Sequence, residues 1–312
     1  MSQRPSMRVV VHGGAGGAPD APAPRQETLD RAAERGADAE TPLDAVEAAL
    51  EPLESSPRFN AGVGGAVQSD GVVRTDAGVM TSDREVGAAC SMPGVERAAS
   101  VARVVHSETP HVFVSGEHAV DLADEFGVET GVDLLTDATR ERYESEDPPR
   151  GGPREHLDWL ATRFGSGSDR AGGGLNNGGA GGDDSGRAPD HDTVGAVASD
   201  GERFAAATST GGRSFALAGR VGDVPQVGSG FFCTEAGGAS ATGAGEDIAR
   251  VTLSRRAVGY LEDGLGAQAA ADKAIEEFEA ITGSSAGVIV LNEAGAGSAF
   301  NTEEMQTSIV SA

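Results

Sequence analysis

A threonine stands where the character of the chain changes abruptly, at the junction Asp192-Thr193-Val194. A glycine-rich tract ends just before it, and the strand-like run from Thr193 to Ala198 begins with it. If the peptide bond before Thr193 were cut, the freed α-amine would titrate at about pH 7.7 to 8.0 and could take the proton of the residue's own hydroxyl. The junction therefore suggests a threonine nucleophile created by chain cleavage.

Three compact clusters of threonine, glycine, arginine and aspartate follow in the second half. They are Thr208-Ser209-Thr210-Gly211-Gly212, Gly219-Arg220-Val221-Gly222-Asp223 and Thr242-Gly243-Ala244-Gly245-Glu246. Each cluster alone is a weak signal, because threonines favour strands and glycines favour turns. The histidines show no zinc-binding spacing.

Local patterns predict the elements that would position these clusters. Strands are expected over Thr193 to Ser199 and Arg203 to Ser209, joined as a hairpin by Asp200-Gly201-Glu202. A helix is expected from Glu246 to about Leu261. In the first half, a strand ending at His12 runs into the glycines at 13–17, which we interpret as a turn without the G-x-G-x-x-G spacing of a dinucleotide site. Together these elements predict an α/β protein with two packed sheets and helices outside.

Composition limits the function further. Asp and Glu outnumber Lys and Arg by 49 to 24, giving a net charge of -25, so nucleic acid is not an expected partner. The one lysine and the acidic surface are typical of cytosolic proteins from salt-loving microbes, although an acidic protein from a GC-rich genome would look alike. Cys90 and Cys233 lack a Cys-x-x-Cys spacing, and no membrane span is apparent, which predicts a cytoplasmic protein.

In this order and spacing, the clusters and the segment His191 to Val197 resemble the plant-type asparaginase and isoaspartyl peptidase family of N-terminal-nucleophile hydrolases. The first half agrees in Val11-His12-Gly13-Gly14-Ala15-Gly16, Leu43-Asp44-Ala45-Val46, Phe59-Asn60-Ala61-Gly62 and Asp76-Ala77-Gly78-Val79-Met80. The resemblance covers nearly the whole chain and implies the four-layer αββα sandwich of that class. Only the N-terminal tip and the glycine-rich tract fall outside it.

The resemblance implies that the precursor cleaves itself between Asp192 and Thr193. Residues 1–192 would become an α subunit ending in a flexible linker at about 165–190, and residues 193–312 a β subunit that stays in the same structural domain. Two such αβ units are expected to form an (αβ)₂ assembly. Catalysis would need no cofactor.

The same resemblance assigns roles to residues. Thr210 would orient the nucleophile Thr193, and Thr242 with Gly243 would form the oxyanion hole. Arg220 suits the α-carboxylate of a substrate and Asp223 its α-ammonium. Two more residues complete the implied set, Gly245 lining the pocket and Asn60 near the nucleophile.

A structural sodium ion is also implied, held by backbone carbonyls of the loop that contains Asn60. Its ligands would be Leu53, Glu54, Ser56, Phe59, Ala61 and Val63. Oxygen ligands suit a hard cation, but backbone carbonyls leave little trace in a sequence.

The expected reaction is hydrolysis of a side-chain amide of L-asparagine or of a β-aspartyl peptide. Glycosylasparaginase is the nearest alternative, because Asp192 resembles that enzyme and the threonine aspartases, whereas Gly211 and the Phe59-Asn60-Ala61-Gly62 segment favour an asparaginase. A non-catalytic binding protein of the same fold is a third possibility. Such a protein would be expected to lose the nucleophile or the oxyanion donors, yet Thr193, Thr210 and Thr242 are all present.

Overall fold

The computed structural model describes residues 7–164 and 193–311, and within these residues the strands form two sheets. The larger sheet has seven strands in the order β11-β1-β5-β6-β2-β3-β4. Their bounds are Arg8–Gly16 (β1), Arg74–Thr81 (β2), Val86–Pro93 (β3), Phe113–Ser115 (β4), Val194–Ser199 (β5), Phe204–Thr210 (β6) and Glu304–Ser311 (β11). The smaller sheet has the order β10-β9-β8-β7, with bounds Phe231–Thr234 (β7), Gly237–Gly243 (β8), Ala286–Asn292 (β9) and Gly295–Phe300 (β10). The mixed α/β class with two sheets is thus confirmed.

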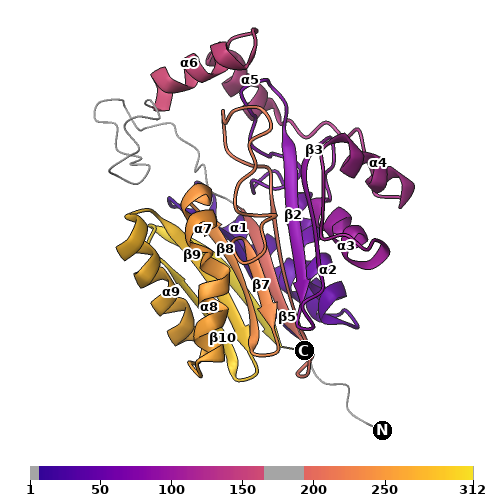
Figure 1. The fold of residues 1–312 in the computed structure, drawn as a ribbon, viewed down its shortest axis with the longest axis vertical. Coiled ribbons are helices and arrows are strands. Elements are labelled where there is room, and N and C mark those ends of the chain that lie inside the picture. The colour runs from indigo at the N-terminus through magenta and orange to yellow at the C-terminus, as the bar shows by residue number, and fades with distance from the viewer. Residues whose placement is uncertain (1–6, 165–192, 312) are drawn as a thin grey trace.

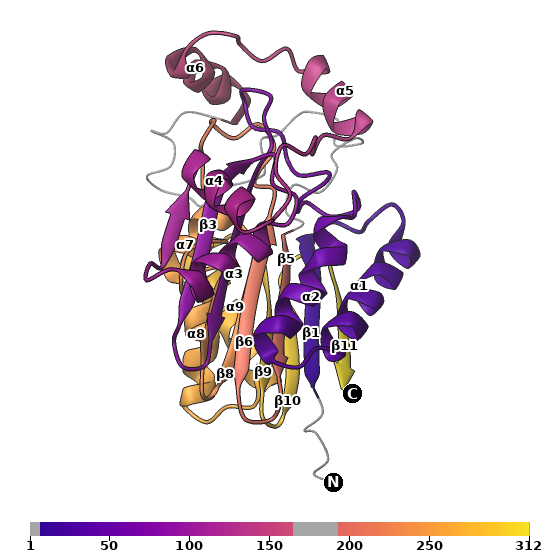
Figure 2. The ribbon, with the colours of Figure 1, turned by 90° about the vertical axis from the view of Figure 1, so that its right-hand side faces the viewer.

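The two sheets pack against each other, and helices lie on their outer faces (Figures 1 and 2). The larger sheet contacts α1 (Pro22–Ala37), α2 (Pro42–Glu54) and α3 (Ala98–Glu108), and the smaller sheet contacts α8 (Leu253–Glu262) and α9 (Ala267–Thr282). Alternate residues of β1 enter different cores: Val9 and Val11 face the helices, while Val10 joins the cluster between the sheets. Because both faces are covered, the central strands read as continuous apolar runs.

The hairpin of β5 and β6 is confirmed at the centre of the larger sheet. These strands pair antiparallel from Val194↔Ser209 to Ser199↔Phe204, with β1 on one side and β2 on the other. Strands that precede and follow the 192/193 junction are therefore interleaved in one sheet. The glycine-rich tract and Asp192 lie outside the described residues.

The prediction of a turn at residues 13–17 is wrong, because β1 continues to Gly16. A register shift between His12 and Ala15 marks a bulge in its pairing with β11, and Gly14 has φ of +107°. At Gly13 a Cβ atom would lie 2.7 Å from the ring of Phe59. These glycines permit a bulge and a close approach within a strand.

The helix predicted from Glu246 to Leu261 is interrupted. It consists of α7 (Gly245–Val251) and α8, separated by Thr252 in the left-handed region with φ of +55°. The break lets the first turn of α8 satisfy its backbone donors outside the helix: the amides of Ser254 and Arg255 donate to the carbonyls of Ser229 and Gly228.

Three further helices precede the glycine-rich tract, α4 (Glu117–Glu125), α5 (Asp137–Ser145) and α6 (Pro153–Phe164). The last two were not expected from the sequence. Tyr143 of α5 and Trp159 of α6 both pack on Phe215, with ring centroids 6.4 and 5.8 Å away. Helices α5 and α6 thus pack on the loop between β6 and β7 through these two rings. None of the described helices is long and apolar enough to cross a membrane.

Candidate active site

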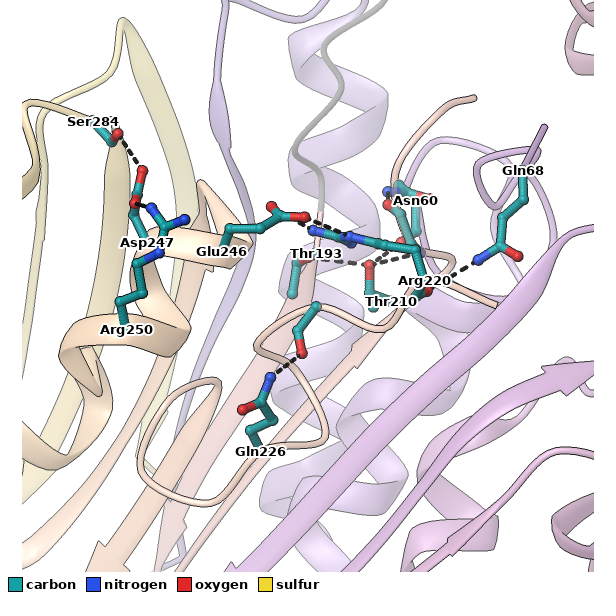
Figure 3. A network of polar contacts seen from close by, with 12 residues as sticks. Asn60, Gln68, Thr193, Thr210, Arg220, Gln226, Glu246, Asp247, Arg250 and Ser284 are labelled. Carbon is teal, nitrogen blue, oxygen red and sulfur yellow. Dashed lines mark hydrogen bonds and ion pairs between the residues drawn. The ribbon is translucent and has the colours of Figure 1, made fainter. Parts of the chain in front are cut away.

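Thr193 lies directly before β5, beside the last residue of β6. Its hydroxyl donates to the hydroxyl of Thr210 with an Oγ1 to Oγ1 distance of 3.2 Å (Figure 3). Both residues are buried, at 9% and 3% exposure. The hairpin register explains the contact, since the pair Val194↔Ser209 places the preceding and following residues next to each other. The structure therefore brings the expected nucleophile and its expected orienting residue together.

Asn60 contacts Thr210 through its own backbone carbonyl rather than through its side chain. The Asn60 carbonyl accepts from the Thr210 hydroxyl at 3.4 Å and from the Gly211 amide at 2.8 Å. Its side chain donates to the Gly212 carbonyl at 2.6 Å and accepts from the Ala66 amide at 2.8 Å. Asn60 thus ties its own loop to the end of β6 and fixes Thr210.

The close contact between the Asn60 loop and the end of β6 requires glycine at position 211. A Cβ atom there would lie 2.4 Å from the Cα of Gly65 and 2.8 Å from Asn60 Oδ1. Contacts that short cannot be relieved by a side-chain rotation when one partner is backbone. An asparagine at position 211 would therefore displace the loop that holds Thr210.

Arg220 lies in the loop between β6 and β7 and is paired with Glu246 at the start of α7. Its Nε and Nη2 atoms donate to the two Glu246 carboxylate oxygens at 2.9 and 2.8 Å, a bidentate geometry. Burial alone would raise the pKa of Glu246, but the hydrogen bonds and charge of Arg220 lower it to about 2. Gln68 holds the same loop, donating to the Arg220 carbonyl at 3.1 Å and accepting from the Gly219 amide at 2.8 Å (Figure 3).

Asp223 follows Arg220 in this loop and is 5% exposed. Burial raises the pKa of its carboxyl to about 6 despite the opposing charge of Arg220. Among the described residues, its Oδ2 atom has no hydrogen-bond partner. A buried carboxylate oxygen without a donor is costly, so this atom is suited to accept from a bound ammonium group.

Gly245 opens α7 opposite both charged residues. A Cβ atom at this position would lie 2.6 Å from Asp223 Oδ1 and 2.9 Å from Arg220 Nη2. A side chain at position 245 would therefore collide with the Asp223 carboxylate and the Arg220 guanidinium.

Thr242 and Gly243 end β8, a strand whose sheet packs on β5. Thr242 is fully buried and pairs with Gly287 of β9. Gly243 has φ of +135°, and a Cβ atom there would lie 2.5 Å from the Ser285 carbonyl oxygen. The close approach of two backbones fixes the amide of Gly243, as a preorganised donor requires.

His12 belongs to a buried polar chain that sequence reasoning did not assign. Its Nε2 lies 3.0 Å from the Ser240 hydroxyl, which lies 2.6 Å from the Thr208 hydroxyl. Burial lowers the pKa of His12 to about 3, although a hydrogen bond to the Thr193 backbone opposes the shift. The imidazole is therefore neutral near pH 7 and serves as a fixed hydrogen-bonding group behind Thr193. The sequence signal was a lone histidine in an otherwise apolar strand.

The loop with the expected sodium ligands folds back on the end of α2. The Val63 amide donates to the Glu54 carbonyl at 2.9 Å, and the Ser56 and Phe59 amides donate to the carbonyls of Leu53 and Ser56 at 3.3 Å. Gly62, with φ of +60°, makes the return possible, since a Cβ atom there would lie 2.1 Å from the Glu54 carbonyl oxygen. Among the described residues, no group of three or more His, Cys, Asp or Glu side chains could hold a metal ion.

Two facing sheets, with a paired threonine hydroxyl at the head of a central strand, are the arrangement expected of a hydrolase that attacks with threonine. The sequence matches a family model described as asparaginase over residues 5–312. The chain belongs to this asparaginase family.

Individual relatives agree. The chain is 35% identical to a plant-type L-asparaginase of Pyrococcus horikoshii, over 95% of this chain and 94% of the relative. It is 36% identical to a plant-type L-asparaginase of Pyrococcus abyssi, over 84% and 81%. An isoaspartyl peptidase/L-asparaginase of Macaca fascicularis is 33% identical over 92% of this chain and 87% of the relative.

Proposed function

We propose that the protein is a self-processing threonine amidohydrolase that converts L-asparagine to L-aspartate and ammonia and cleaves β-aspartyl dipeptides. The observation that carries this proposal is the Thr193–Thr210 hydroxyl pair, 3.2 Å apart at the strand start that follows the cleavage junction. The family and the named relatives support the same chemistry.

The proposed mechanism follows from the groups around this pair. After cleavage between Asp192 and Thr193, the free amine of Thr193 takes the proton of its hydroxyl, which attacks the substrate's side-chain carbonyl. Thr242 and Gly243 stabilise the negative charge that develops on the carbonyl oxygen. Ammonia or an amino acid leaves, and water releases aspartate from the Thr193 ester.

The head group of the substrate is bound by opposite charges. Arg220 takes the α-carboxylate and the Asp223 carboxylate takes the α-ammonium, with Gly245 providing space between them. Glu246 occupies the Nε edge of Arg220, so the Nη1 side of the guanidinium remains as the face for a substrate. Glu246 thereby fixes the orientation of the guanidinium.

The proposal includes the four-layer αββα sandwich of N-terminal-nucleophile hydrolases. Helices packed outside two contacting sheets support it. The interleaving of β1 and β2 with β5 and β6 supports the expectation that residues 1–192 and 193–312 stay one structural domain after cleavage.

A comparison of three substrates tests the proposed function. We expect aspartate to be released from L-asparagine and β-aspartyl-leucine at rates well above that from N-acetylglucosaminyl-asparagine. The requirement for glycine at position 211, where glycosylasparaginases tend to carry asparagine, supports this order. Preference for the sugar-linked substrate would show that the protein is a glycosylasparaginase instead.

We also propose that the carbonyls of Leu53, Glu54, Ser56, Phe59, Ala61 and Val63 bind a structural sodium ion. The return of the loop onto the end of α2, through the bond from the Val63 amide to the Glu54 carbonyl, supports this because it brings Val63 back beside the residues that end α2. A cation bound only by the folded state raises stability by mass action. The unfolding temperature should therefore be higher in a sodium salt than in a caesium salt of the same ionic strength. An equal unfolding temperature in both salts would contradict the site.

The remaining expectations concern the setting of the protein. We propose that the protein is cytoplasmic, that it belongs to a salt-loving cell and that it forms an (αβ)₂ assembly. The net charge of -25 supports the salt-loving cell, and the two buried free cysteines support a reducing compartment; the assembly is carried over from the family resemblance. Salt at molar concentration would screen the self-repulsion of such a surface. Sedimentation in low and in molar KCl tests the assembly and the adaptation to salt. Single αβ units would oppose the (αβ)₂ assembly, and a loss of structure at high salt would oppose the salt-loving cell.

A further inference from the structure

Asp76 is a buried carboxyl that the mechanism above does not use. It lies in β2, where it pairs in register with Thr210 of β6. Residues directly opposite each other in an antiparallel pair project from the same face of the sheet. Thr193, Thr210 and Asp76 therefore form a row across three neighbouring strands, on the face that packs toward the smaller sheet.

The core clusters agree with this orientation. Met80, four residues after Asp76 on the same strand face, belongs to the cluster between the sheets, whereas Ala77 and Val79 belong to the cluster under the helices. Likewise Ala206, four residues before Thr210, belongs to the cluster between the sheets. Asp76 thus faces the layer that contains the loop with Arg220 and Asp223.

The carboxyl of Asp76 is only half satisfied. Its Oδ1 atom accepts from the Ser91 amide at 2.7 Å, and Ser91 has φ of +55°, a strained conformation for a residue other than glycine. Its Oδ2 atom has no hydrogen-bond partner among the described residues, although the side chain is 1% exposed. The residue in the strained conformation, Ser91, thus holds Oδ1 of Asp76, while Oδ2 of the same carboxyl has no partner among the described residues.

The charged residues near Asp76 belong to the loop between β6 and β7. Arg220 and Asp223 act on it from the loop between β6 and β7, and the Cys90 thiol lies near it on β3. Burial raises the pKa of Asp76 to about 7, with the nearby charge of Asp223 adding to the shift and the Ser91 hydrogen bond and Arg220 opposing it. The charges of Asp76 and Asp223 also act on the Arg220 guanidinium, which Glu246 binds directly. Two of these carboxyls, Asp76 and Asp223, retain an oxygen without a partner in the described part of the chain.

We propose that Asp76 is a positioning residue of the amino-acid head-group site, which acts with Asp223 to favour a substrate carrying an α-ammonium group. A bound ammonium adds one positive charge near Asp76 and Asp223, two buried carboxyls that each keep an oxygen without a hydrogen-bond partner among the described residues. Arg220 and Asp223 bind the head group directly, while Asp76 acts through them. This inference rests on the proposed function, because it concerns the same pocket.

The test compares a ligand that has an ammonium group with one that lacks it. L-aspartate and succinate are titrated into the parent and Asp76→Asn, a variant that keeps the acceptor for the Ser91 amide. We expect the dissociation constant for L-aspartate to rise about tenfold, equivalent to about 1.4 kcal/mol, and that for succinate to change by less than about twofold. Equal weakening of both ligands would indicate a merely structural role and overturn the proposal. Asp83→Asn, at the exposed turn of the same β2–β3 hairpin, is the matched control and should leave both constants unchanged.

The parent protein supplies a second measurement that needs no variant. Because the carboxyls of Asp76 and Asp223 bind protons between pH 8 and pH 6, their negative charge decreases as the pH falls. The α-amine of Thr193 also gains a proton, near pH 7.7 to 8.0, but its positive charge acts on the carboxylates of both ligands. The ratio of the affinity for L-aspartate to the affinity for succinate should therefore fall between pH 8 and pH 6. A parallel change for both ligands would overturn the proposal even if Asp76→Asn does not fold. If the parent hydrolyses neither asparagine nor β-aspartyl peptides, the proposed function is wrong, whereas an active parent with equal losses in Asp76→Asn refutes only the role of Asp76.

Discussion

Thr193→Ala should accumulate as one uncut chain of 31.4 kDa, whereas the parent should separate into two fragments that meet at Thr193. In the proposed mechanism, the hydroxyl that attacks the preceding peptide bond is the same hydroxyl that later attacks the substrate, so its removal should block both steps. Activity toward L-asparagine should fall by a factor of at least roughly 10⁴, as for other enzymes that lose their nucleophile. Intact-mass analysis and an aspartate-release assay measure the two effects.

Two controls make this result specific. Thr193→Ser keeps a hydroxyl and should still be cleaved, with the smaller fragment now starting at the serine. Thr282→Ala removes a hydroxyl at the end of α9 that donates to the Phe278 carbonyl and accepts from the Ser284 amide, and it should be cleaved like the parent. An uncut parent with full activity would refute the N-terminal nucleophile.

The contact between Thr193 and Thr210 could be predicted because local sequence determines the positions of both residues. The run from Thr193 and the Asp200-Gly201-Glu202 turn specify a hairpin, and the register of that hairpin alone places Thr193 beside Thr210. Turn length and strand alternation are local properties, so they can be inferred without knowledge of the tertiary fold. The mixed α/β class followed from the same kind of pattern.

Other features depend on tertiary contacts and could not be inferred. The glycines after His12 form a bulged strand only because Phe59 packs against Gly13 and β11 pairs with β1. The break at Thr252 exists because the carbonyls of Gly228 and Ser229 accept from α8. Glu246 was visible as an acidic residue at a helix start, a position that is common for reasons of helix electrostatics alone. Its pairing with Arg220 is set by a loop 26 residues away.

Arg220→Gln should lower kcat/KM for L-asparagine by roughly 10²- to 10³-fold, mainly through a higher KM. The guanidinium is mostly buried, with 17% of its side chain exposed; Glu246 binds it through two hydrogen bonds, and the charges of Asp223 and Asp76 act on it. Its removal deletes the proposed partner of the substrate carboxylate and leaves Glu246 without its ion pair. Arg220→Lys should recover only part of the loss, because an ammonium group cannot bind Glu246 and a substrate through separate edges of a planar fork.

A second substitution separates substrate binding from stability in this prediction. In Arg220→Gln, the unpaired Glu246 carboxylate should lower the unfolding temperature. Adding Glu246→Gln should restore part of it, because breaking a partly buried pair costs more than replacing both partners. The double variant should nevertheless keep the high KM, since no cation faces the substrate carboxylate. Arg203→Gln is the control: Arg203 pairs with Asp200 at 2.7 Å but is 62% exposed, so its loss should change stability by less than about 1 kcal/mol and leave KM unaltered. A double variant that regains both stability and the parent KM would mean that Arg220 only supports the loop, and that the substrate carboxylate is bound elsewhere.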